Sequence, residues 1–321
     1  MKRLFAGLAV LLCAVGVGSA QAANVPLIGV LLINKATNPQ PVVPLIRNAL
    51  AALGYVEDRN LRLDFRFAEA NAERFPALAE ELVGDKATVI ITLGDAATHA
   101  AQRATRTIPI VAIADDLVGA GLIDSMAQPG GNTTGISILA TELDAKKLEI
   151  LKEIVPSVRR LGVLRDPASI FPGRTEAIVE AGRSLGVELQ TVDASSPADF
   201  DAAFALFHAG GVGGIDILAS PMLANSPEEL AELSIRYKLP AICQFREMVA
   251  AGCLASYGVK RAEMYAMLAG YIDKMLKGAR PAETVARQPT ALELVINRKT
   301  ARKLGVEISP AILARADEVI E

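Results

Sequence analysis

Short runs of apolar residues alternate along the chain with segments of helical period. The first four runs are LIGVLLI (27–33), LRLDFRF (61–67), TVIITL (88–93) and IPIVAI (108–113). Their length and β-branched content predict strands, with helices of about ten residues between them. Because strands that alternate with helices form βαβ units, we expect an α/β fold built on a parallel sheet.

The pattern then begins again, which predicts a second lobe. The second series comprises RLGVLR (160–165), VELQTV (187–192), GIDILAS (214–220), LPAICQ (239–244) and CLASYG (253–258). Pro109 and Gly121 recur 131 positions later as Pro240 and Gly252, each at the same place in its strand order. The repeat predicts two Rossmann-like lobes of the same topology, each with its own sheet.

Two such lobes have a predictable binding place. Ligands of open α/β sheets bind beyond the carboxyl ends of the strands, where loops and helix N-termini converge. When two lobes face each other, these ends enclose a cleft. The arrangement favours capture of a small solute by closure about a hinge.

The N-terminus has the order of a cleavable secretory signal. Lys2-Arg3 precede an apolar run over residues 4–17, and small residues lead to Ala20-Gln21-Ala22. We therefore expect residues 1–22 to be removed and the mature protein to reside in the periplasm.

Composition narrows the class of partner. Removal of Lys2 and Arg3 from the 33 basic residues leaves 31 against 36 acidic ones, a formal charge of −5 that disfavours nucleic acid.

Cys243 and Cys253 remain after processing. They form either a disulfide, which an exported protein permits, or two buried thiols, and the sequence favours neither.

One glycine-rich stretch, MAQPGGNTTGIS (126–137), invites comparison with phosphate-binding loops. Such loops carry a lysine after the glycines or open a helix directly after a strand. Here Gly130-Gly131 lead instead into the β-branched sequence TGISIL. The stretch is therefore expected to be a tight turn that feeds a strand on the way from the first lobe to the second.

Nothing in the sequence indicates an enzyme. His99 and His208 lie inside predicted helices, far from residues with metal-ligand spacing, and H-E-x-x-H, G-x-S-x-G and paired C-x-x-C motifs are absent. We expect no catalytic residue, no metal and no cofactor. A periplasmic hydrolase that uses two carboxylates in the same cleft stays open as the alternative.

Several long stretches resemble one known family. QPGGNTTGIS, KKLEILKEIVPSVRRLGVLRDP, LPAICQFREMVAAGCLASYG and QPTALELVINRKTARKLGVEISPAILARADEVIE are similar to ABC-transporter substrate-binding proteins of the tryptophan/tyrosine type. The resemblance covers essentially the whole mature chain. It implies the type I periplasmic-binding fold with a three-crossing hinge, and a receptor that delivers its solute to the transmembrane subunits of an ABC permease.

The lobes are expected to be built from separate stretches of chain. Residues 23–139 and 259–286 form the N-terminal lobe, and residues 140–258 and 287–321 form the C-terminal lobe. We expect a monomer, with the basic run NRKTARK (297–303) on a solvated helix face.

Residues at or just past predicted strand ends are the candidate ligand contacts. They are Asn34, Thr37, Gly94, Asp95, Ala96, Asp115, Asp116, Asp166, Ser169, Phe171, Ser220, Met222, Gln244 and Phe245.

Four of these residues, all aspartates, suggest the chemistry of the ligand. Asp115 and Asp116 in the first lobe and Asp166 in the second would together hold an ammonium or a polyol, unless they are solvated loop residues. The helix that opens at Asp95 either offers free amides to a carboxylate or uses Asp95 as its N-cap. The family often has a hydroxyl residue at this turn, so Asp95 argues against an anion there.

Two phenylalanines add an aromatic option. Phe171 and Phe245 either stack on an aromatic ligand or pack in the core. We expect a small zwitterionic or aromatic metabolite.

Overall fold

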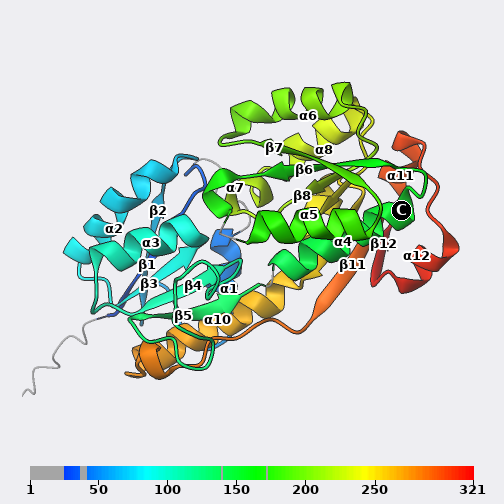
Figure 1. Cartoon of the computed structure of the whole chain (residues 1–321). Helices are drawn as coiled ribbons and strands as arrows, with labels where there is room; N and C mark the ends of the chain where they lie inside the picture. The colour runs from blue at the N-terminus through cyan, green and yellow to red at the C-terminus, as the bar shows by residue number, and fades with distance from the viewer. Residues whose placement is uncertain (1–24, 37–41, 139, 171–172) are drawn as a thin grey trace, which may run out of the picture.

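The computed structural model describes residues 25–36, 42–138, 140–170 and 173–321 (Figure 1). The predicted signal segment 1–22 and the candidate contacts Thr37 and Phe171 lie outside the described residues. No helix among these residues has the length and apolar character needed to cross a membrane.

The first lobe is built on a five-stranded parallel sheet. The strands are β1 (Leu27–Leu32), β2 (Arg62–Phe67), β3 (Val89–Leu93), β4 (Ile110–Ala114) and β5 (Thr133–Ser137), in the order β2-β1-β3-β4-β5. Helices cover both faces, so central strands such as β1 are apolar and buried along their whole length.

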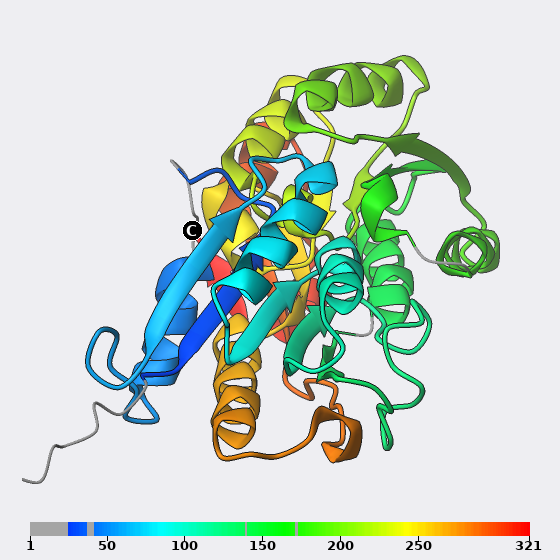
Figure 2. The same ribbon diagram turned by 90° about the vertical axis from the view of Figure 1, so that its left-hand side faces the viewer.

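Each face of this sheet has its own pair of helices. α1 (Val42–Ala51) and α10 (Arg261–Leu276) pack together on one face, and α2 (Phe75–Gly84) and α3 (Asp95–Ala104) pack on the other. Figure 2 shows α10, in gold, beside the first sheet although it follows a strand of the second.

The second lobe has a seven-stranded sheet in the order β12-β11-β10-β9-β8-β6-β7. Its strands are β6 (Arg160–Arg165), β7 (Glu188–Asp193), β8 (Ile215–Ile217), β9 (Ala241–Cys243), β10 (Ala255–Val259), β11 (Leu292–Asn297) and β12 (Glu318–Ile320). Its helices are α4 (Ala140–Ile154), α5 (Arg174–Ser184), α6 (Phe200–Ala209), α7 (Pro221–Ala224), α8 (Pro227–Arg236), α9 (Arg246–Ala251), α11 (Arg298–Leu304) and α12 (Pro310–Arg315).

The strand orders confirm the repeat inferred from the sequence. β7-β6-β8-β9-β10 of the second sheet has the same order and direction as β2-β1-β3-β4-β5 of the first. β11 departs from this scheme, because it runs antiparallel to β10. The chain reaches β11 from the hinge and therefore enters the sheet from the opposite end.

The chain passes between the lobes three times. One crossing joins β5 to α4, a second joins β10 to α10, and a third leads to β11. In the third crossing the Arg287 amide donates to the Gly135 carbonyl at 3.0 Å, and the Lys260 amide donates to the Ala291 carbonyl at 3.1 Å. The crossings therefore lie side by side, as a hinge requires.

Two local expectations are answered by the fold. Gly130 has a φ of 91°, and the Asn132 side chain donates to the carbonyls of Thr105 and Ile108, so the glycine-rich stretch is a turn that feeds β5. Of the two alternatives for the cysteines, the disulfide is correct: Cys243 and Cys253 are bonded, with their Cα atoms 6.8 Å apart.

Candidate functional site

A cavity of about 60 Å³ lies between the lobes. The first lobe contributes the ends of β3 and β4, and the second contributes the start of α7 and the residues after β9. The beginning of α10 closes the hinge side. The lining is apolar apart from a few polar side chains, namely Asp115, Ser220, Asn225, Gln244 and Arg261.

The lobes touch around this cavity, so the arrangement is closed. Gly94 has a φ of 89°, and a Cβ at this position would stand 2.8 Å from the Pro221 ring of the opposite lobe. Beside this contact, the Asn225 amide donates to the Asn34 side chain at 3.1 Å. Gly94 thus provides both the turn from β3 into α3 and the close approach of α7.

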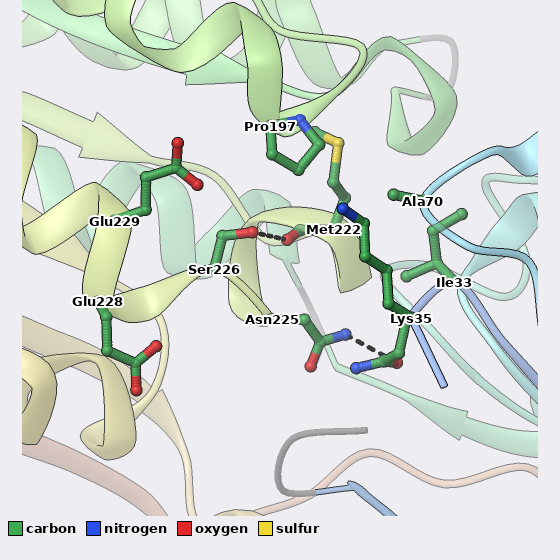
Figure 3. A pocket seen from close by; sticks show the side chains of 10 residues that line it. Ile33, Lys35, Ala70, Pro197, Met222, Asn225, Ser226, Glu228 and Glu229 are labelled. Carbon is green, nitrogen blue, oxygen red and sulfur yellow. Dashed lines mark hydrogen bonds between the residues drawn. The ribbon is translucent and has the colours of Figure 1, made fainter. Parts of the chain in front are cut away.

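A wider cavity of about 290 Å³ opens toward solvent (Figure 3). Ile33 and Lys35 line it from the first lobe, and Met222, Asn225 and Ser226 from the second. Asn225 also borders the inner cavity. The two spaces therefore share part of their walls at Asn225, the residue that follows α7.

A third, small hollow of about 20 Å³ lies on the other side of the Gly94–Pro221 contact. Asp95, Asp166 and Ser169 line it. Burial between the lobes raises the pKa of Asp95 to about 7, and the charge of Asp115 adds to the rise. Burial also raises the pKa of Asp166, although the Ala168 amide, which donates to its carboxylate at 3.0 Å, opposes that rise.

A buried ion network ties the lobes together behind the cavity. Arg174, at the start of α5, donates to Asp115 of the first lobe at 2.5 Å and to Asp144 of α4 at 3.0 Å. Lys147 extends the network to Asp216 at 2.6 Å. All of these side chains are buried, so each charge depends on its partners for compensation.

A second group of polar side chains stands where α10 begins. Arg261 stacks over the Phe245 ring at 4.8 Å, and Gln244 precedes Phe245 in the chain. Both Gln244 and Arg261 line the inner cavity.

Most of the sequence-predicted contacts lie in the cleft. Gly94, Asp115, Ser220, Gln244 and Phe245 line the inner cavity, and Asn34 and Met222 line the outer one. Asp95, Ala96, Asp166 and Ser169 line the small hollow. Their role in ligand binding stays a prediction.

The carboxylates are arranged differently from the expectation of a shared cluster. Asp115 is committed to Arg174, and Asp116 accepts from the Val118 and Gly119 amides of its own loop at 3.0 Å. Asp115 and Asp166 are buried, so neither is a solvated loop residue. Asp166 shares its hollow with Asp95 instead.

Two further alternatives are decided. Asp95 is the first residue of α3, and Gly94 is its N-cap, so the N-cap role for Asp95 was wrong. Phe245 is both a core residue and a cavity wall.

Sequence analysis missed Arg174 and Arg261. Each is the first residue of a helix, where the positive end of the helix dipole disfavours a cation. A basic residue at that position was the available signal.

Among the described residues, no group of three or more His, Cys, Asp or Glu side chains has the arrangement to hold a metal ion. The family comparison then decides the assignment, because the model of the ABC transporter substrate binding protein family matches residues 39–320. The chain belongs to this family. It is a type I periplasmic substrate-binding protein of the tryptophan/tyrosine type.

Relatives of known name or structure agree with this assignment. A tyrosine-binding protein of Clostridioides difficile is 25% identical over 264 residues, which cover 81% of this chain and 75% of the relative. A conserved domain protein of Vibrio cholerae is 28% identical with a TM-score of 0.83, and covers 92% of this chain and 99% of its own.

A third relative was solved with a ligand. The ABC domain from Streptococcus pneumoniae in complex with L-Trp is 24% identical with a TM-score of 0.81, over 92% of this chain and 99% of its own. At this level of identity the likeness shows the fold. The family and the tyrosine-binding relative are binding proteins.

Proposed function

We propose that this protein is the solute-binding component of an ABC importer, which captures an amino-acid-like or aromatic metabolite between its lobes and delivers it to the membrane permease. In this role the chain is exported through its N-terminal signal and works in the periplasm.

The closed cleft is the observation that carries the proposal. Two lobes of like topology meet around an apolar cavity into which a few polar side chains of both lobes are placed, and three chain crossings form the hinge. A solute that contacts both lobes stabilises the closed form relative to the open one. The ligands of two relatives, tyrosine and L-Trp, support the amino-acid class.

Binding with closure is the direct test. The protein is titrated with L-tyrosine, L-tryptophan and L-phenylalanine in a calorimeter, and its radius of gyration is measured by small-angle X-ray scattering with and without each compound. We expect saturable 1:1 binding and a smaller radius with the bound ligand. Binding without any change in radius contradicts hinge capture.

The same samples separate a receptor from a hydrolase. After incubation, the solute is recovered and analysed by mass spectrometry. A receptor returns the solute unchanged in stoichiometric amount, whereas turnover of the solute contradicts the proposal.

A further inference from the structure

Arg261 is buried at the hinge side of the cleft without the partners that a buried cation normally has. Arg261 is 6% exposed, and its Nε and Nη1 atoms have no hydrogen-bond partner within the part of the chain that the structure describes. The carboxylate that approaches it, Glu247, stays 3.9 Å away, which is beyond hydrogen-bond distance. A buried guanidinium in this state costs stability unless an anion joins it.

The aromatic rings around Arg261 hold it in place. Its guanidinium lies 4.8 Å from the centre of the Phe245 ring and 5.9 Å from that of Tyr265. Such stacking fixes the plane of the guanidinium, and the Nε and Nη1 atoms in that plane have no hydrogen-bond partner among the described residues. Arg261 is thus positioned in advance of any ligand.

Gln244 repeats the same feature beside it. The residue is 3% exposed, and neither its amide nitrogen nor its amide oxygen is hydrogen bonded to any described residue. Native proteins leave few buried polar side-chain atoms without partners. Here one donor and one acceptor remain on a residue that lines the same cavity as Arg261.

The other charges at this cavity do not compete for an anion. Asp115 also lines it, but its carboxylate is paired with Arg174 at 2.5 Å. The remaining lining is apolar or neutral. Among the described residues that line the inner cavity, Arg261 and Gln244 therefore offer a cation and an amide donor, and the one carboxylate, that of Asp115, is already paired.

We propose that Arg261 and Gln244 form a carboxylate subsite, so that the solute of this protein is a small organic acid. This inference rests on the proposed binding function and names its ligand class. The Arg261 guanidinium and the Gln244 amide nitrogen donate to the carboxylate, and the Gln244 amide oxygen accepts from a hydroxyl or ammonium group on the adjacent carbon.

The volume of the cavity sets the size of the buried end. A space of about 60 Å³ corresponds to roughly four or five water positions. A carboxylate with its neighbouring carbon and one substituent fits such a space, and a longer body extends past Asn225 toward the outer cavity of about 290 Å³.

Matched pairs of compounds test the subsite. L-lactate, benzoate and L-tyrosine are compared with 1,2-propanediol, benzyl alcohol and tyramine, which lack the carboxylate. Thermal unfolding of the full mature protein reports binding, because a ligand of the folded state raises the Tm. We expect at least one carboxylate to raise the Tm and its partner compound to have no effect.

Variants assign the effect to the residues. Arg261→Met is expected to weaken binding of the stabilising carboxylate at least tenfold in calorimetry, which corresponds to the loss of a charged hydrogen bond. Gln244→Leu is expected to weaken it less, and Arg261→Lys is expected to retain part of the affinity. Arg246→Met is the matched control, since Arg246 pairs with Glu318 on the surface.

Each result bears on the proposal. If no carboxylate raises the Tm of the wild type, or if Arg261→Met binds it with unchanged affinity while Arg246→Met behaves the same, the carboxylate subsite is wrong. Binding and closure with tyramine or an uncharged compound overturn the subsite but leave the proposed receptor function intact. Should Arg261→Met fail to fold by circular dichroism, Gln244→Leu and Arg261→Lys carry the test.

Discussion

Two arginines begin helices on opposite sides of the interlobe cleft, and their surroundings differ. Arg174 donates to Asp115, Asp144 and the carbonyls of Ser169 and Ala219. Arg261 stacks on aromatic rings, and the Glu247 carboxylate lies 3.9 Å from it. Both side chains are almost fully buried, so burial alone does not distinguish them.

The difference separates a structural cation from a receptive one. The Arg174 network joins the first lobe to the second and satisfies the charges that it buries. The Arg261 region leaves donors unsatisfied and places them at a cavity. The Arg174 network stabilises the closed form, whereas we propose that Arg261 is completed by the carboxylate of a ligand.

The largest predicted effect comes from removing Arg174. Arg174→Met leaves Asp115 and Asp144 buried without their partner, and is expected to lower the free energy of unfolding by about 3 to 5 kcal/mol. Denaturation in urea measures the change. Arg183→Met on the same helix is the control, because Arg183 is 72% exposed as a side chain and should change the value by less than about 0.5 kcal/mol. An equal loss of the free energy of unfolding in both variants would contradict the structural role of Arg174.

The raised pKa of Asp95 predicts that the free energy of unfolding depends on pH. Its folded-state pKa is raised from 3.8 to about 7 by burial. The folded state therefore holds the proton more tightly, and the stability that this group contributes is present below pH 4 and is lost as the pH rises to 7.

The variant Asp95→Asn removes this titration. Between pH 5 and pH 7 the wild type should lose about 2 kcal/mol relative to Asp95→Asn, since one pKa unit corresponds to about 1.36 kcal/mol and the folded-state carboxyl is itself half ionised at pH 7. Urea denaturation at several pH values measures both proteins. A constant difference between them across this range would show that Asp95 ionises normally.

The disulfide tests how firmly the Arg261 region is held. Cys243 precedes Gln244 and is bonded to Cys253, ten positions further on. The double variant Cys243→Ala/Cys253→Ala is expected to lose about 2 to 3 kcal/mol of stability, the value for a short loop. It should also weaken binding of the carboxylate more than a variant that loses the same stability at a site away from the cavity. Unchanged stability would contradict the role of this bridge.

The smallest predicted change in stability belongs to Arg261 itself. Arg261→Met removes a cation whose Nε and Nη1 atoms have no hydrogen-bond partner among the described residues, so the free energy of unfolding of the ligand-free protein should change by less than about 1 kcal/mol in either direction. The contrast with Arg174→Met, measured in the same urea series, is the sharpest form of the comparison. A loss of more than about 3 kcal/mol in the free energy of unfolding would show that Arg261, like Arg174, has a structural role.

The fold followed from sequence because its signals are local. Apolar runs and turn residues predicted nine strands at nearly their observed positions, and the spacing of Pro109 and Pro240 predicted equivalent lobes. β11 was not predicted. Its residues LELVIN give no sign of the antiparallel direction, which depends on the end of the sheet at which the chain arrives from the hinge.

The site was less predictable because it depends on pairing across the lobes. Strand ends correctly indicated Gln244 and Asp115 as cavity residues. The sequence does not show that Arg174 reaches Asp115 across 59 positions, which leaves Asp115 unavailable to an ammonium. It also does not show that Arg261 has no hydrogen-bonded carboxylate among the described residues and that Glu247 stays 3.9 Å away.

Nuclear magnetic resonance of the guanidinium groups distinguishes a structural arginine from one that binds the ligand. In protein labelled with 15N-arginine, the Nε–H signals of Arg174 and Arg261 are assigned by their loss in Arg174→Lys and Arg261→Lys, and are followed as L-lactate, benzoate or L-tyrosine is added. We expect the Arg261 signal to shift with saturable binding while the Arg174 signal stays in place. A bound carboxylate that leaves Arg261 unchanged, or that shifts both signals equally, would contradict this expectation.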